Sequence, residues 1–324
     1  MMHELHRMDG WECLADEFGL LSAGKARIAG LTARDLRTLT KRGEIQHLAR
    51  GWYALPSACT PIDVDTPAER RRRRHLLLTR AAVQTFEGRV AASHHSALVI
   101  HRLPVFATDL NTVHLMRVAD DHSRSRRGLT VHQHVAGCGI HNGLVDPAVA
   151  VVQAGMVNGP MAALIAADAA LNRRLIDIDD LNHAATLMGG PRIAPVRRLL
   201  AHADGRAESP GETRLRDAMR LMGFSTVPQA VVVDGSFTAV VDLLLTDASV
   251  VIEFDGFVKY GRTVSHPDEL APADVVVAEK LREDHLRELR YVVIRVTWSE
   301  LSDLVALRRR IERAIALARL LPAA

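Results

Sequence analysis

Residues 241–256 read VDLLLTDASVVIEFDG, two apolar runs separated by a short polar turn. Runs of Val, Ile and Leu on either side of such a turn are typical of paired, buried β-strands. The hairpin nevertheless carries three carboxylates, Asp242, Glu253 and Asp255. Because an ionised acid without a partner is costly in a core, these acids must meet a cation or a hydrogen-bond donor. The stretch therefore predicts a buried sheet with a cluster of acids built into it.

The three acids are expected to lie close together. Residues two apart in a strand face the same way, so Glu253 and Asp255 point to one side. A turn near residues 246–248 brings Asp242 back alongside them. Carboxylates this close stay ionised only if a cation joins them, and Mg²⁺ (or Mn²⁺) suits carboxylate and phosphate oxygens. Such an ion orients a water molecule and stabilises the charge that develops on phosphorus.

Three further side chains complete the predicted catalytic set. Glu212 lies in the first turn of the preceding helix, where it is placed to bind the ion or its water. Lys259, just after the Asp-Gly pair, and Lys280, at the start of the next helix, are candidates to contact the scissile phosphate. The alternative is structural: the two aspartates cap turns, and Glu253 forms an ion pair with Arg295. Spacing alone leaves both alternatives open.

The pattern of residues 206–324 predicts an α/β domain with the element order αβββαβα. A helix beginning near Pro210 has an apolar stripe, and three strands and a loop of some twenty residues with Pro267 and Pro272 follow it. An amphipathic helix, a buried strand and a closing helix complete the order. The expected strands cover residues 225–233, 237–245, 249–255 and 291–298.

The first 60 residues predict a winged helix-turn-helix. Apolar residues at helical spacing predict a helix over 11–28, Thr32 caps a second helix that ends at Gly43, and a hairpin follows. The expected DNA contacts are the cations of the second helix and the wing: Arg34, Arg37, Lys41, Arg42 and Arg50. Recognition helices present such side chains to the major groove of double-stranded DNA. The alternative is a small helical domain with a solvated basic face.

Residues 61–205 predict a mixed α/β middle region without an evident function. Thr66 is the expected N-cap of a helix that carries the run Arg70–Arg74, whose charges point all around its circumference. His94 and His95 are expected at a helix start capped by Ser93. Zinc-type ligands also occur in this region, without the paired spacing of structural zinc sites. They are His132, His134, Cys138 and His141.

Composition places the chain among globular proteins of more than one domain. It has 324 residues, of which 48% are hydrophobic and 24% charged. No apolar run reaches the length of a membrane span. Cys13, Cys59 and Cys138 are far apart and belong to no motif, which favours a reducing compartment, and we expect a cytoplasmic location.

Several motifs resemble known families. In order, SPGETRLR, VVDLLL, VVIEFDG and EKLREDHLRELRYVVIRVTWSEL resemble the Vsr-like branch of the PD-(D/E)XK nuclease superfamily, over roughly residues 206–320. The segment GLTARDLRTLTKRGEIQHLARGWYALP resembles the winged helix of AbiEi-type antitoxins, and ASHHSALVIHRLP resembles the segment that follows in those proteins.

The first resemblance implies a restriction-endonuclease-like fold and a role for each acid. Glu212 matches the helix acid of the family, Asp242 its central metal ligand, and Glu253 and Asp255 the acids of the following strand. The segment from Lys280 to Asp284, which includes Arg282, matches its basic helix.

Two features depart from the family. Asp255 replaces the lysine that usually follows the strand acid. Where the Vsr repair enzymes have a histidine after this strand, the chain has Lys259 and Tyr260, with His266 further along. Mismatch-repair specificity is therefore not carried over.

Together these features predict a DNA-binding protein with a Mg²⁺-dependent, nuclease-like domain that hydrolyses nucleic-acid phosphodiesters. The alternative is an AbiEi-like antitoxin or transcriptional repressor whose nuclease fold is degenerate and inactive. That resemblance implies a cognate toxin as partner, and a homodimer is expected because winged-helix regulators often pair.

Overall fold

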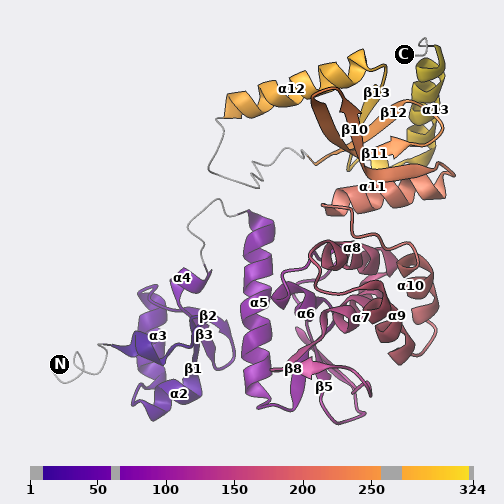
Figure 1. The fold of residues 1–324 in the computed structure, drawn as a ribbon. Helices are drawn as coiled ribbons and strands as arrows, with labels where there is room; N and C mark the ends of the chain where they lie inside the picture. The colour runs from indigo at the N-terminus through magenta and orange to yellow at the C-terminus, as the bar shows by residue number, and fades with distance from the viewer. Residues whose placement is uncertain (1–9, 60–65, 257–271, 321–324) are drawn as a thin grey trace. The chain divides into compact units, whose positions relative to one another are not determined.

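The computed structural model describes residues 10–59, 66–256 and 272–320 (Figure 1). The chain divides into two compact units. The first comprises Met1–Ala166 and Leu175–His202, and the second comprises Ala167–Arg174 and Ala203–Ala324. Helices and several sheets occur in the chain, which confirms the α/β fold class.

The first unit begins with a small three-stranded sheet of order β1-β3-β2, antiparallel throughout. Its elements in chain order are η1 (Trp11–Leu14), β1 (Leu20–Ser22), α2 (Ala23–Ile28), α3 (Ala33–Lys41), β2 (Gln46–Ala49), β3 (Trp52–Ala54) and α4 (Pro56–Cys59). The core of this segment is formed by Trp11, Leu21, Leu36 and Leu39 with their apolar neighbours.

The helix predicted over residues 11–28 is wrong, because this segment forms η1, β1 and α2 instead. The Asp16 carboxylate accepts hydrogen bonds from the backbone N–H groups of Phe18 (3.0 Å) and Leu20 (2.9 Å). Gly19 then adopts a positive φ of 75°, which a helix does not allow. A side chain that bonds its own backbone thus replaces the helical hydrogen bonds with a turn.

The predicted helix caps are confirmed at Thr32 and Thr66. Thr32 forms a capping box with Asp35 at the start of α3, and Thr66 forms one with Glu69 at the start of α5 (Pro67–Thr85). Each box satisfies N–H groups that the first helical turn leaves unpaired. Gly43, with φ of 74°, follows the end of α3, as expected of a residue just past a helix.

The rest of the first unit is a mixed sheet with helices against it. The sheet has the order β6-β7-β5-β4-β9-β8, with β5 parallel to β7 and β4 parallel to β9. Its strands are β4 (Val90–Ala92), β5 (Val113–Arg117), β6 (Arg124–Arg126), β7 (Leu129–His132), β8 (Ile140–His141) and β9 (Leu144–Val145). The helices are α5, α6 (His94–Ile100), α7 (Pro147–Asn158), α8 (Pro160–Asn172), α9 (Ile178–Leu187) and α10 (Ile193–Leu200).

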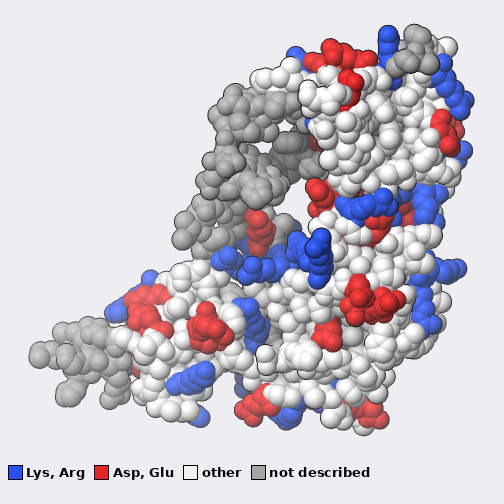
Figure 2. Space-filling model, viewed as in Figure 1, with Lys and Arg blue, Asp and Glu red and all other residues white. Residues whose placement is uncertain are grey.

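The arginine run at the start of α5 is divided between two environments. Arg72 donates from Nη2 to the Leu103 carbonyl at 2.9 Å, and Arg73 donates from Nη1 to the Ala58 carbonyl at 3.5 Å. Arg70, Arg71 and Arg74 are exposed. Figure 2 shows Lys and Arg side chains gathered around the first turns of this helix.

The second unit is built on a four-stranded sheet of order β10-β11-β12-β13. β11 is antiparallel to both β10 and β12, and β13 is parallel to β12. Its elements are α11 (Pro210–Leu221), β10 (Thr226–Asp234), β11 (Phe237–Leu245), β12 (Val250–Asp255), α12 (Pro272–Glu288), β13 (Val292–Thr297), η2 (Glu300–Ser302) and α13 (Leu304–Leu320). Apart from the short η2, this is the order αβββαβα that the sequence predicts.

Helices cover both faces of this sheet (Figure 1). One face packs against α11 and α13 through residues such as Met219 and Ile311. The other packs against α12 through Leu286. Pro272 begins α12, so this helix starts earlier than the sequence predicted.

Part of α8 belongs to the second unit. The Asp168 carboxylate accepts hydrogen bonds from Thr213 Oγ1 (2.8 Å) and Arg216 Nη2 (2.6 Å), both on α11. Burial raises the pKa of Asp168, and the neighbouring Arg216 charge opposes that rise. Among the helices in the described ranges, none is long and apolar enough to cross a membrane.

Candidate functional site

Asp242 lies on β11 of the second unit, beside the neighbouring strand β12. Leu243 pairs with Ile252 across these antiparallel strands, which brings Asp242 beside the Glu253 end of β12. Asp242 Oδ2 accepts a hydrogen bond of 2.7 Å from the Phe254 backbone N–H. The strand pairing therefore brings two of the predicted acids to one end of the hairpin.

Asp242 is in an environment that disfavours its charge. Burial raises the pKa of Asp242 to about 6, and the nearby charges of Glu212 and Glu253 add to the effect. The hydrogen bond from Phe254 and the charge of Arg282 act in the opposite direction without cancelling it. A carboxyl with two acids beside it takes a proton or a cation readily.

Hydrogen bonds hold both the backbone and the side chain of Glu212. Its N–H donates to Ser209 Oγ at 3.2 Å, which caps α11. Its Oε2 accepts hydrogen bonds from the Glu208 N–H (2.9 Å) and from Gln229 Nε2 (3.0 Å). Glu212 therefore occupies the helix position that the sequence predicted, with Gln229 as a partner that the sequence analysis did not identify.

Gln229 reaches Glu212 because β10 is irregular at this point. Pro228 pairs with Leu243 and Ala230 with Val241, so the register of β10 against β11 is the same on both sides of Gln229. Its φ of 50° is in the left-handed region. A residue in this uncommon backbone conformation aims its side chain differently from its neighbours in the strand, and such residues cluster at functional sites. A proline followed by a polar residue inside an apolar strand was the available signal.

Two arginines balance the negative charge of Glu253. It is 8% exposed, and its Oε1 lies 2.5 Å from Arg282 Nη2. Its Oε2 lies 3.6 Å from Nε of Arg295, the partner named in the structural alternative. Arg282 also donates from Nη1 to the Val240 carbonyl at 2.9 Å, which holds α12 to the sheet.

The three remaining predicted catalytic residues are Asp255, Lys280 and Lys259. Asp255 is half-buried and is aligned with Thr297 of β13, and Lys280 is exposed on α12. Lys259 lies outside the described residues. Within the described ranges, Asp242, Glu253 and Asp255 are not among the groups whose ligand atoms all lie within 4.8 Å of one another.

The cations predicted to contact DNA are exposed in the first unit. Arg34, Arg37 and Lys41 lie on one side of α3, three and four residues apart, while Leu36 and Leu39 are buried on the other. Arg42 lies 3.8 Å from Glu44, a weak exposed pair. Arg50 is exposed at the turn between β2 and β3.

The zinc-type ligands of the middle region do not come together as one set. The His134 ring Nδ1 lies 3.3 Å from the Arg117 carbonyl, and His141 Nε2 lies 3.5 Å from Asp146 Oδ1. Burial raises the pKa of the Cys138 thiol to about 11. His132 instead groups with His94 and His114. Ser93 occupies the predicted N-cap position without a capping hydrogen bond from its side chain.

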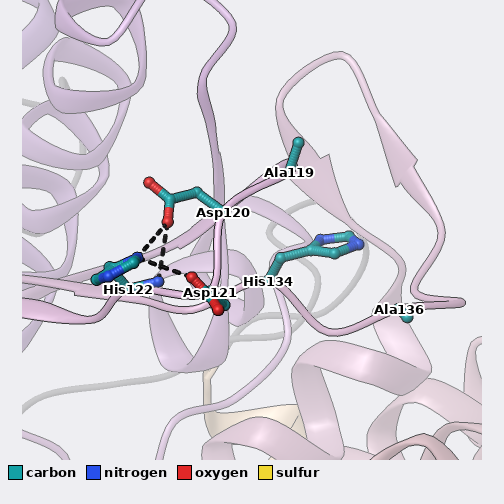
Figure 3. A pocket seen from close by; sticks show the side chains of 6 residues that line it. All are labelled: Ala119, Asp120, Asp121, His122, His134 and Ala136. Carbon is teal, nitrogen blue, oxygen red and sulfur yellow. Dashed lines mark hydrogen bonds and ion pairs between the residues drawn. The ribbon is translucent and has the colours of Figure 1, made fainter.

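A second group, of Asp120, Asp121 and His122, lies in an exposed loop that lines a pocket with Ala119, His134 and Ala136 (Figure 3). His122 Nδ1 lies 3.0 Å from Asp120 Oδ1 and 2.7 Å from Asp121 Oδ1. The imidazole is 84% exposed, so water competes for each of these contacts. The two acids of this loop therefore already have partners: Arg117 and His122 for Asp120, and His122 for Asp121.

The chain matches no protein-family model, and its sequence matches none of the curated proteins compared with it.

Proposed function

We propose that the protein binds double-stranded DNA through α3 and the β2–β3 turn of its first unit. The observation that carries this proposal is the exposed row of Arg34, Arg37 and Lys41 on a helix whose opposite side is buried. Phosphate contacts of this type supply most non-specific affinity for DNA. The strand order β1-β3-β2 with α2 and α3 between β1 and β2 fits the proposed winged helix, in which α3 enters the major groove.

A charge-reversal variant tests DNA binding. Replacing Arg34, Arg37 and Lys41 together by Glu is expected to abolish the binding of duplex DNA at moderate salt, measured by fluorescence anisotropy. Asp242→Ala, in the second unit, is the matched control and is expected to retain wild-type affinity. If the triple variant binds DNA as the wild type does, this proposal is wrong.

A second candidate function is Mg²⁺-dependent hydrolysis of a nucleic-acid phosphodiester in the second unit. It is favoured by the meeting of Asp242, Glu212 and Glu253, because burial, together with the charges of the two glutamates, raises the pKa of Asp242 to about 6. The helix and strand order fits the proposed Vsr-like, restriction-endonuclease-like fold. In this proposal Asp242, Glu253 and Asp255 bind Mg²⁺ or Mn²⁺, Glu212 orients water, and Lys259 or Lys280 faces the phosphate.

Cleavage of plasmid and single-stranded DNA or RNA with Mg²⁺ or Mn²⁺ tests this second function. Wild-type protein is expected to cleave one of these substrates, and Asp242→Ala to lose cleavage while keeping its DNA affinity. The absence of metal-dependent cleavage on every substrate by wild-type protein contradicts it.

The ion pairs of Glu253 favour the alternative of a degenerate nuclease fold. Arg282 at 2.5 Å and Arg295 at 3.6 Å supply the positive charge that a metal ion would otherwise supply. In that case the protein is an AbiEi-like repressor or antitoxin, with a toxin as partner. Mn²⁺ titration of the full chain beside Asp242→Ala separates the two, because the variant binds less Mn²⁺ than the wild type only if Asp242 holds the ion.

A further inference from the structure

Three histidines from separate elements of the first unit gather at one point. His94 is the first residue of α6, His114 belongs to β5, and His132 ends β7. One ring nitrogen from each lies within 4.8 Å of the other two. His94 and His114 are buried, and His132 is half-buried. We propose that these three imidazoles bind a single Zn²⁺-class transition-metal ion.

The spacing of the rings suits this ion. Two nitrogens at roughly 2.0–2.1 Å from a tetrahedral zinc ion lie about 3.3 Å apart. His114 Nδ1 and His132 Nε2 lie 2.9 Å apart. The His94 ring stacks on His132 with centroids 3.8 Å apart and an interplanar angle of 21°. The contact between His114 and His132 is a hydrogen bond between the two rings, so binding one ion requires this bond to open and the stacked His94 and His132 rings to rotate.

Surrounding hydrogen bonds fix two of the three ligands. Ser93 Oγ lies 2.9 Å from His94 Nδ1, which leaves Nε2 of that ring to face the metal. The His94 backbone N–H donates to Gln153 Oε1 at 3.3 Å. The backbone N–H of His114 donates to Ser96 Oγ at 2.8 Å. The Ser93 contact is of the kind by which a partner on the other ring nitrogen commonly holds a metal-binding histidine, and the other two bonds position the backbone.

The electrostatics of the group favour neutral rings, the form that coordinates metal. Burial lowers the pKa of His114 to about 3 and that of His132 to about 4. Burial also lowers the pKa of His94 well below its usual value. The backbone of His94 has a φ of 52°, an uncommon conformation for a residue with a side chain and one that clusters at functional sites.

The donor set defines the class of ion. Three imidazole nitrogens without a carboxylate suit Zn²⁺, Co²⁺ or Ni²⁺ and are unsuited to Mg²⁺ or Ca²⁺. Three protein ligands leave the fourth tetrahedral position for water or a small anion. This site is separate from the carboxylates of the second unit and does not depend on the DNA-binding or nuclease proposals.

Zinc binding by the full chain tests the inference. After chelator treatment and its removal, wild-type protein is titrated with Zn²⁺ by calorimetry, and Co²⁺ is added in parallel as a spectroscopic probe. We expect one Zn²⁺ per chain and a tetrahedral Co²⁺ spectrum without a thiolate charge-transfer band. His132→Gln, at the half-buried ligand, is expected to lose this binding, and Ser93→Ala to weaken it about tenfold.

Two variants distinguish the other ligand types of the region. His122→Ala removes the exposed loop group, and Cys138→Ser removes the thiol; both are expected to keep full binding. Wild-type protein that binds no Zn²⁺ overturns the inference whatever the variants do. So does binding that survives in folded His132→Gln and disappears in His122→Ala or Cys138→Ser. Circular dichroism of each variant establishes that it is folded.

Discussion

At the scale of single residues, two neighbouring acids of the second unit have different partners. Glu253 lies between two arginines, whereas Asp242 has one backbone N–H and acids beside it. Packing of the sheet does not require an acid at position 242. The cost of keeping Asp242 ionised is therefore the feature on which the proposed metal site depends.

This cost predicts that Asp242→Asn stabilises the protein at high pH. The folded-state pKa of Asp242 is about 6, above its usual value of 3.8, so the unfolded chain releases this proton more readily. The stability that protonated Asp242 contributes is therefore fully present below about pH 4 and is lost as the pH rises through about 6. Asn keeps the acceptor for the Phe254 N–H and removes the charge.

Urea unfolding at pH 4 and pH 8, followed by Trp298 fluorescence, measures the effect. Asp242→Asn is expected to raise the midpoint at pH 8 and to change it little at pH 4. Asp247→Asn, at the exposed turn of the same hairpin, is the control and is expected to behave as wild type at both values. A stabilisation by Asp242→Asn that is equal at pH 4 and pH 8 contradicts the assigned pKa shift.

Only part of this site follows from the sequence. Strand alternation and the hairpin turn predict that Asp242 and Glu253 meet, because both rules act over short distances in the chain. The contact of Gln229 depends on its left-handed backbone conformation, and that of Arg282 on how α12 lies against the sheet. Neither is set by local spacing. The three-histidine group depends on the pairing of β5 with β7, parallel neighbours separated in sequence by β6.

At the scale of elements, α3 is the helix on which the DNA-binding proposal depends. Thr32 and Asp35 form its capping box, and Leu36 and Leu39 bind it to the core of its segment. Its exposed side is thereby held in a fixed orientation, as a helix that enters a groove requires.

Removing the cap is expected to weaken this segment. Thr32→Ala leaves N–H groups at the start of α3 without their acceptor, which costs about 1 kcal/mol of stability. Urea unfolding followed by Trp11 and Trp52 fluorescence measures the loss. Thr38→Ala, in the same helix, removes a hydroxyl that bonds the Arg34 carbonyl and is expected to change stability by less than about 0.5 kcal/mol. Equal losses in both variants contradict the capping role.

The helices and strands were predicted best where several local signals agree. The helix α11, with its apolar stripe, and the three strands after it lie close to their predicted bounds. The helix over residues 11–28 was wrong because apolar spacing was given more weight than Asp16 and Gly19, which form the turn. Three-residue strands such as β1 are stabilised by their neighbours in the sheet and leave little pattern in the sequence.

At the scale of the whole molecule, the chain joins two units with separate cores. The proposed DNA contacts and the three-histidine group belong to the first unit, and the acids belong to the second. Variants in one unit are therefore expected to leave the activity of the other intact.

The salt dependence of DNA affinity tests the central proposal most directly. Each phosphate contact contributes about 0.9 to the slope of log K against log salt concentration, so the loss of three contacts reduces it by about 2.7. We expect this reduction for Arg34→Ala/Arg37→Ala/Lys41→Ala, measured by fluorescence anisotropy across a salt series. The matched control Arg309→Ala/Arg313→Ala/Arg319→Ala removes three exposed arginines of α13 and is expected to keep the wild-type slope. An unchanged slope for the α3 variant, or an equal reduction for the α13 variant, would contradict DNA binding through α3.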